Sequence, residues 1–385
     1  MTEVVQGLAI DNRRFGDSFA LGFEDPLANI RGREGVGIFD ESSRHALIRG
    51  DCREVLGLLP KESVNCVITS PPYWQQREYE VDKEYESGLI GAEKESEAYV
   101  RSLVEVFRKV KRVLKPDGSV WLNIGDKYVD KNLMGMPWRV ALGMTKDGWI
   151  LRNDIIWYSS KGTQSAKDRF RDIYEHIFHF VQSKDYYFKQ DEVLLEPVKV
   201  PKFTNGKIVS ATGVNGDKYR KQIEESQSLT AEERKQALAA LDETLRQMEA
   251  GELVDFRMTI RGQQRLLHSD RNGISGRAKE LEKRGYYILK SHSEGYMPTD
   301  IWKIVPEDQV KERDSHYAAF PVELLKRPIA STCPDLSGIV LDPFVGTGTS
   351  VLAALSLNRI GIGIDISTKY LQIAKDRLRA SQVRL

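Results

Sequence analysis

The stretch SGIVLDPFVGTGTS, at residues 337–350, decides the fold of this chain. An apolar run rich in β-branched residues is followed by a loop with two glycines and then by residues typical of a helix start. This order predicts a buried strand, a tight turn and a helix. Gly346 and Gly348 let the backbone turn sharply and approach a ligand where a Cβ atom would clash. The next apolar run, RIGIGIDIS at 359–367, predicts a second strand that ends near Asp365.

The same alternation of strand and helix occurs in the N-terminal half. Helices are predicted at 52–60 and 96–114, and the turn KPDG at 115–118 closes the second one. Predicted strands are HALIRGD (45–51), VNCVITS (64–70), SVWLNIGD (119–126), WILRNDIIWYSS (149–160) and YEHIFHFVQS (174–183). This rhythm predicts an α/β fold with a doubly wound, mostly parallel sheet. Functional residues of such sheets gather at the carboxyl ends of the strands.

The glycine loop indicates a nucleoside ligand. Asp365 follows it at about the spacing at which a carboxylate accepts both ribose hydroxyls in nucleoside-binding α/β folds. The loop lacks both the lysine ending of a phosphate-binding P-loop and the GxGxxG dinucleotide fingerprint. A ligand without a pyrophosphate, such as S-adenosylmethionine, fits better, and the alternative is a turn that binds nothing. The candidate cofactor-binding residues of this part are Asp342, Phe344, Gly346, Thr347, Gly348, Thr349 and Asp365.

The segment TSPPYW, at 69–74, is the candidate catalytic loop. Pro71 and Pro72 stop a buried strand and leave rigid backbone carbonyls without partners in the chain. The hydroxyl of Ser70 and the carbonyl of Pro71 could then accept the two N–H groups of an exocyclic amine, while Tyr73 stacks on the base that carries it. The alternative is a rigid surface turn or a polyproline ligand.

Together the two loops resemble those of the amino-methyltransferases of bacterial restriction–modification systems. The catalytic signature of that family is Asp, Asn or Ser followed by Pro-Pro and an aromatic residue. The serine form found at 70–73 resembles the cytosine-N4 subgroup, whereas adenine-N6 enzymes more often carry Asp. The family's Phe-x-Gly-x-Gly cofactor loop matches 344–348. The catalytic loop precedes the cofactor loop, an order that resembles the family's beta group.

This resemblance implies a circularly permuted, Rossmann-like methyltransferase fold that uses S-adenosylmethionine and no metal. It also implies that Asp51 lies near the adenine of the cofactor and that the segment of His316 and Phe320 belongs to the cofactor site. The implied reaction is transfer of a methyl group to the N4 amine of cytosine in double-stranded DNA, alongside a restriction endonuclease that acts on the same site. An adenine-N6 enzyme, a methyltransferase of RNA or another substrate, and a DNA-binding regulator with a relic cofactor pocket remain alternatives.

Between the two loops the composition changes, which suggests an inserted module. We expect an N-terminal arm at 1–43, methyltransferase halves at 44–190 and 298–385, and a target-recognition insert at 191–297. Thr230 is a plausible N-cap of a long helix in the insert. Phosphate or base contacts are one use of the basic residues near the loops and in the insert, and a charged exposed surface is the other. The candidate DNA-binding residues are Trp74, Lys161, Lys167, Arg169, Arg171, Arg261, Arg265, Arg271 and Arg277.

Composition sets few further limits. The formal net charge is +1, so a nucleic-acid partner needs a local basic face. The three cysteines lack zinc-site spacing, and the two that lie in apolar runs are expected to be buried. His176 and His179 are expected to have structural roles. No apolar run has the length of a membrane span, and the N-terminus lacks a signal-peptide pattern, so a cytoplasmic enzyme is expected.

Overall fold

The chain folds into two compact units, Met1–Val193 together with Thr299–Leu385, and Leu194–Pro298. The insert predicted at 191–297 has nearly the bounds of the second unit. The computed structural model describes residues 25–76, 81–158, 167–197, 200–262, 276–305 and 320–382.

The first unit contains a nine-stranded sheet in the described residues, with the strand order β1-β2-β15-β14-β3-β4-β8-β7-β13. Its strands are β1 (Gly37–Glu41), β2 (His45–Arg49), β3 (Val64–Thr69), β4 (Leu114–Ile124), β7 (Ile150–Tyr158), β8 (Tyr174–Val181), β13 (Ile301–Lys303), β14 (Ile339–Asp342) and β15 (Ile360–Asp365). Pairing is parallel from β2 to β4, and β8 runs antiparallel to both its neighbours. The predicted α/β fold with a mostly parallel sheet is confirmed.

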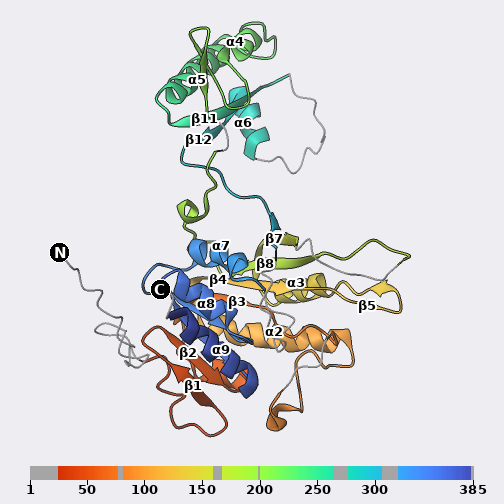
Figure 1. Cartoon of the computed structure of the whole chain (residues 1–385). Helices are drawn as coiled ribbons and strands as arrows, with labels where there is room; N and C mark the ends of the chain where they lie inside the picture. Colours follow the sequence, from red (N-terminus) through yellow and green to blue (C-terminus); the bar gives the residue numbers. More distant parts are fainter. Residues whose placement is uncertain are drawn as a thin grey trace, which may run out of the picture. The chain divides into compact units, whose positions relative to one another are not determined.

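Strands from the two ends of the chain complete this sheet. The C-terminal pair β14 and β15 lies between the N-terminal strands, because β14 pairs with β3 and β15 pairs with β2. Figure 1 shows β1 and β2, coloured red to orange, beside the blue C-terminal helix α9, which contacts β2. All five parallel strands from β2 to β4 therefore end at one edge, where Asp51, Ser70, Asp342 and Asp365 follow.

Helices cover both faces of the sheet. On one face α1 (Cys52–Leu58), α2 (Ser96–Val113) and α3 (Met136–Lys146) share a core with Val67 and Leu341. On the other face α7 (Val322–Thr332) and α8 (Thr349–Ser356) share a core with Cys66 and Val340, and α9 (Thr368–Gln382) packs on Leu47. Successive residues of a strand point to opposite faces, which is why these strands are apolar throughout instead of alternating.

Two sequence predictions for the first unit need correction. The expected irregular arm at 1–43 includes β1, which pairs antiparallel with β2, and its Leu27 and Ile30 are buried in the core. The expected turn at 115–118 lies within β4 as a bulge, because Leu114 pairs with Val64 while Ser119 already pairs with Cys66. Extra residues on one strand of a pair are accommodated in this way without ending the strand.

The second unit has its own small core. Its described elements are β9 (Lys202–Thr204), β10 (Lys207–Val209), α4 (Gly216–Glu224), α5 (Ala231–Glu249), β11 (Leu253–Ile260), α6 (Gly276–Arg284) and β12 (Tyr286–His292). Strands β11 and β12 form an antiparallel ribbon whose Phe256 packs with Leu241 of α5. The predicted N-cap is confirmed, since Thr230 and Glu233 form a reciprocal capping box at the start of α5.

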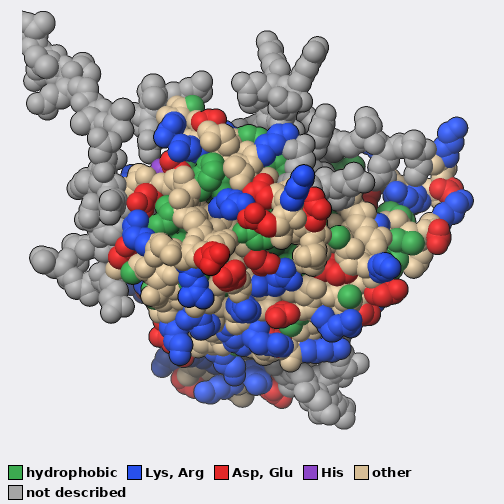
Figure 2. Space-filling model, turned by 90° about the horizontal axis from the view of Figure 1, so that it is seen from below, with side chains coloured by type: hydrophobic (Ala, Val, Ile, Leu, Met, Phe, Trp, Pro, Cys, Tyr) green, Lys and Arg blue, Asp and Glu red, His purple; other side chains and the backbone are tan. Residues whose placement is uncertain are grey.

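Cysteine and histidine side chains have structural roles. All three cysteines are buried and free, although burial was expected for only two of them. His179 stacks on Trp121 and lies next to the hydroxyl of Ser119, and burial lowers its pKa to about 3, so the ring is a neutral structural group. Acidic and basic side chains are interspersed over the face of the molecule that Figure 2 shows. Within the described residues, no helix combines the length and apolarity that a bilayer crossing requires.

A buried carboxylate, that of Asp342, joins the segments that end at the functional edge. Its Oδ1 accepts hydrogen bonds from the Thr69 hydroxyl at 2.6 Å and from the Phe344 amide at 3.0 Å, and its Oδ2 accepts one from the Ser350 hydroxyl at 2.6 Å. The side chain is only 2% exposed, and burial raises its pKa to about 6. Strand β3, the glycine loop and helix α8 are thus held by one group.

The raised pKa of Asp342 predicts a pH-dependent stability. The unfolded value is about 3.9, so the folded protein binds the proton more tightly, and this stabilisation is lost as the pH rises through the folded pKa. Asp342→Asn keeps the Oδ1 acceptor but does not titrate. Relative to this variant, the free energy of unfolding of the wild type should fall by roughly 1.4 kcal/mol between about pH 5 and pH 7.

Urea unfolding of both proteins across that pH range measures the difference. Asp365, whose pKa is raised in the same direction, is present in both proteins and cancels to first order. A difference that stays constant with pH would contradict the burial of a titrating carboxylate at this position.

Candidate active site

The two loops singled out in the sequence line one cavity of about 340 Å³, at the carboxyl edge of the sheet. This volume is in the range of small-molecule sites. The loops are separated by some 270 residues in the chain, and β3 and β14 bring them together by direct pairing. The predicted residues that line the cavity are Asp51, Ser70, Pro71, Pro72, Tyr73, Phe320, Asp342, Phe344, Gly346, Thr347, Thr349 and Asp365.

The glycine loop forms a cradle for the predicted nucleoside cofactor. Gly346 has φ +50° and open space where a Cβ atom would lie, so the backbone itself borders the cavity. The Asp365 carboxylate accepts one hydrogen bond on each oxygen, from the Gly346 amide at 2.8 Å and from the Ser367 amide at 2.9 Å. Each carboxylate oxygen has a further lone pair, so both can still accept a ribose hydroxyl. Burial raises the pKa of Asp365 to about 6.

Asp51 also lines the cavity, and it caps helix α1 by accepting a hydrogen bond from the Arg53 amide at 2.7 Å. The Arg53 guanidinium also contacts this carboxylate and the Gly88 carbonyl. Residues 88–92 line the cavity as well. Earlier in the same segment, the Asp82 carboxylate accepts a hydrogen bond from Nε of Arg49 at 2.8 Å. Sequence reasoning did not identify this segment, which has no periodicity to mark it.

Gly348 lets the glycine loop pack closely against helix α9. It does not line the cavity; its φ is +82° and a Cβ atom would come within 2.8 Å of Ala374 on α9. Arg377 of the same helix donates to the Thr347 hydroxyl at 2.9 Å and to the Thr349 hydroxyl at 3.1 Å. These contacts hold the start of α8 against α9, and Thr349, the first residue of α8, lines the cavity.

At the catalytic loop, hydrogen bonds run in one direction, from Ser70 to Glu175. The Ser70 hydroxyl donates to the Tyr73 hydroxyl at 3.2 Å, which donates to Oε2 of Glu175 at 2.6 Å. Since the proton of Ser70 is used in this chain, the lone pairs of its Oγ remain able to accept N–H groups. The Tyr73 ring packs beside Gly125, where a Cβ atom would lie 2.9 Å from it.

Asn123 holds this chain in place. Its Nδ2 donates to the Tyr73 hydroxyl at 2.9 Å and to Glu175 at 2.8 Å. Its Oδ1 is buried without a partner among the described residues, which costs about 1–3 kcal/mol. Neither Asn123 nor Glu175 was predicted from the sequence. Glu175 reaches the edge because β8 is antiparallel and begins where β4 ends, with His176 paired to Ile124.

One predicted DNA contact, that of Trp74, is wrong because its ring is buried, whereas the contact of Arg261 stays a prediction. Trp74 is 7% exposed in the main core, and its Nε1 donates to the Glu93 carbonyl at 2.8 Å. Arg261 donates to the Ser228 carbonyl at 2.7 Å and to Glu233 at 2.6 Å, within the second unit. A run of charge in the sequence does not reveal such internal partners.

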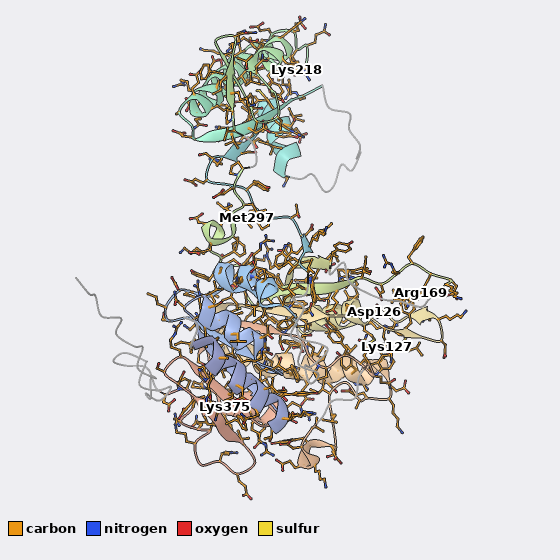
Figure 3. The ribbon with its side chains drawn as sticks, in the orientation of Figure 1. Asp126, Lys127, Arg169, Lys218, Met297 and Lys375 are labelled. Atoms are coloured by element: carbon orange, nitrogen blue, oxygen red, sulfur yellow. The ribbon has the colours of Figure 1, made fainter. Side chains whose placement is uncertain are left out.

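The other basic candidates differ in exposure. Lys167 and Arg171 are exposed, and the Arg169 guanidinium lies 3.6 Å from the ring centroid of Tyr128. Figure 3 shows Arg169 at the same end of the first unit as Asp126 and Lys127. Outside the described residues lie His316, Lys161, Arg265, Arg271 and the side chain of Arg277. In the described part of the chain, no three His, Cys, Asp or Glu side chains are grouped as metal ligands would be.

Comparison with known proteins agrees with this geometry. The chain matches the model of the DNA methylase family, which covers N6 and N4 enzymes, over residues 64–376. It is 29% identical to the Type II methyltransferase M.SfiI of Streptomyces fimbriatus, over 85% of this chain and 89% of that one. It is 36% identical to M.SmaI of Serratia marcescens, over 45% of this chain and 68% of that one.

A solved structure is similar in fold. The PvuII DNA methyltransferase, described as cytosine-N4-specific, has a TM-score of 0.52 and 17% identity, over 87% of this chain and 86% of that one. The family resemblance inferred from the two loops is confirmed. The cavity therefore belongs to an enzyme that uses S-adenosylmethionine, and the chain is a member of the N6 and N4 DNA methylase family.

Proposed function

We propose that this DNA methylase transfers a methyl group to the N4 amine of cytosine in double-stranded DNA, as the modification enzyme of a restriction–modification system. The observation that carries this proposal is Ser70, a neutral acceptor at the end of β3 in the same cavity as the cofactor loop. Its serine-type signature favours cytosine over adenine. The Type II methyltransferases among its relatives support the restriction context and a partner endonuclease that acts on the same site.

In this proposal the chain acts mainly by alignment. Bound S-adenosylmethionine supplies an electrophilic methyl group, so no covalent enzyme intermediate is required. Asp365 accepts the ribose hydroxyls, and Asp51 lies at the adenine end. The Ser70 hydroxyl and the Pro71 carbonyl accept the two N–H groups of the target amine, which directs the nitrogen lone pair toward the methyl donor. The base must leave the duplex to reach this position.

The hydrogen-bond chain offers a route for the proton that the methylated amine must lose. The amine can release it to Oγ of Ser70 while the Ser70 proton passes to Tyr73 and the Tyr73 proton passes to Glu175. A carboxylate ends the chain and can hold the proton before it reaches water. Serine alone is a weak base at neutral pH, so the role of Glu175 is to make the acceptor effective.

Product analysis tests the target base. Genomic DNA from cells that express the protein should contain N4-methylcytosine at one short site when nucleosides are separated and the DNA is sequenced with base-level detection. Wild-type and Ser70→Ala proteins are compared, and the variant should yield little product. Finding N6-methyladenine alone would overturn the choice of cytosine and leave the family assignment intact.

Loss of the ribose acceptor should weaken cofactor binding. Hydrogen bonds to a charged group contribute about 1.5–3 kcal/mol each, so Asp365→Ala should raise the Kd for S-adenosylmethionine by at least about tenfold in isothermal titration calorimetry. The control is Asp376→Ala, which removes an exposed carboxylate of α9 that accepts a hydrogen bond from Gln372. Equal affinities for the wild type and Asp365→Ala would reject the ribose role.

The proton route predicts a defect in turnover with little change in binding. Tyr73→Phe keeps the ring but breaks the chain, and Glu175→Gln replaces its terminal acceptor. Both should lower kcat by about a hundredfold and leave the KM for cofactor within about twofold, measured by steady-state methyl transfer. Tyr186→Phe, which loses a hydroxyl contact to Arg152 outside the cavity, is the matched control. Unchanged kcat in both variants would eliminate the route.

A further inference from the structure

We propose that Phe170 enters the base stack of the DNA and occupies the space that the target base leaves when it turns into the cavity. This inference rests on the proposed methylation of double-stranded DNA and adds a residue to which neither the sequence motifs nor the family match assigns a role. It concerns the segment 167–173, which leads into strand β8.

Phe170 is exposed to an unusual degree. Its side chain is 98% exposed, the highest value among the large apolar side chains of the described residues. Apolar surface of this size is normally buried, and loop residues that remain exposed are often those that contact a partner. A single ring that projects into solvent has the shape of a wedge, not of a flat docking surface.

The chain brings Phe170 close to the start of the strand that carries Glu175. Arg169 lies over Tyr128, which follows β4 and the Tyr73-contacting Gly125. Glu175, five residues after Phe170, accepts the hydrogen bond of Tyr73. Five extended residues span at most about 18 Å, so the Cα atom of Phe170 lies within that distance of the Cα atom of Glu175. Figure 3 shows the end of the first unit where Arg169, Asp126 and Lys127 lie.

Positive charge surrounds the ring. Lys167 and Arg171 are exposed on either side of it, and the acidic Asp168 is paired with Lys131 at 2.8 Å. Cationic side chains of this kind contact DNA phosphates and fix the position of a protein on the duplex. An aromatic ring between them would then face the bases, where stacking does not depend on sequence.

Base extrusion creates a gap in the DNA that Phe170 could fill. A base that leaves the duplex opens a gap in the stack, and proteins fill such gaps with apolar side chains inserted between base steps. Phe170 would stack on the neighbouring bases and so stabilise the extruded state. A mismatched target base costs less to extrude, so we expect it to stay extruded in the complex even without the ring.

This difference defines the experiment. The full chain and its Phe170→Ala variant are compared on two duplexes that carry the site found by product sequencing, one with a paired target base and one with a mismatched target base. Loss of one base–aromatic stack is expected to raise the Kd for the paired duplex roughly tenfold, and to reduce the signal of a fluorescent base analogue at the target position. On the mismatched duplex the analogue signal should change little, because extrusion costs less there.

Leu336→Ala is the control, since this side chain is also apolar and 77% exposed; it should behave as the wild type on both duplexes. A raised Kd with an unchanged analogue signal in the saturated complex of the paired duplex would overturn the wedge and make Phe170 a docking contact. Unchanged DNA binding together with a change in oligomeric mass would overturn it in favour of self-association. If the wild type methylates DNA and Phe170→Ala matches it throughout, this inference alone fails, whereas a wild type inactive on every duplex would overturn the proposed function as well.

Discussion

The whole site depends on one buried carboxylate that accepts three hydrogen bonds. Asp342 joins Thr69, at the end of the catalytic strand, to the cofactor loop at Phe344 and to the first turn of α8 at Ser350. Burying a charge is costly unless it is fully hydrogen-bonded, and here both oxygens have donors. The group therefore holds together loops that meet only because the strands before them pair in parallel.

Near Asp342, several residues adopt locally unfavourable conformations or lack a hydrogen-bond partner. Gly346 and Gly348 take left-handed backbone conformations, one beside the cavity and one against α9. Asn123 leaves its Oδ1 without a partner among the described residues while its Nδ2 orients Tyr73 and Glu175. Departures from ideal local structure tend to concentrate at functional sites. Their position here, at the carboxyl edge of one sheet, agrees with that tendency.

Much of the fold and of the cavity could be predicted because the signals are local. Apolar runs with β-branched residues identified β3, β14 and β15, and the prolines and glycines that follow them identified both loops. Predictions were incomplete where a partner is distant. Trp74 and Arg261 look like surface residues in sequence, but Trp74 is buried in the core and Arg261 is hydrogen-bonded to Ser228 within the second unit. Composition does not encode such contacts.

The sequence by itself determined the class of fold, the order of the two loops, the family and the cofactor, since each depends on residue types at short spacing. Only the tertiary structure decided that Glu175 ends a hydrogen-bond chain from Ser70, that Trp74 is a core residue and that Phe170 is exposed. The physical reason is strand direction and burial. Because β8 runs antiparallel to β4, its first residues reach the functional edge, and no local pattern distinguishes that strand from a parallel one.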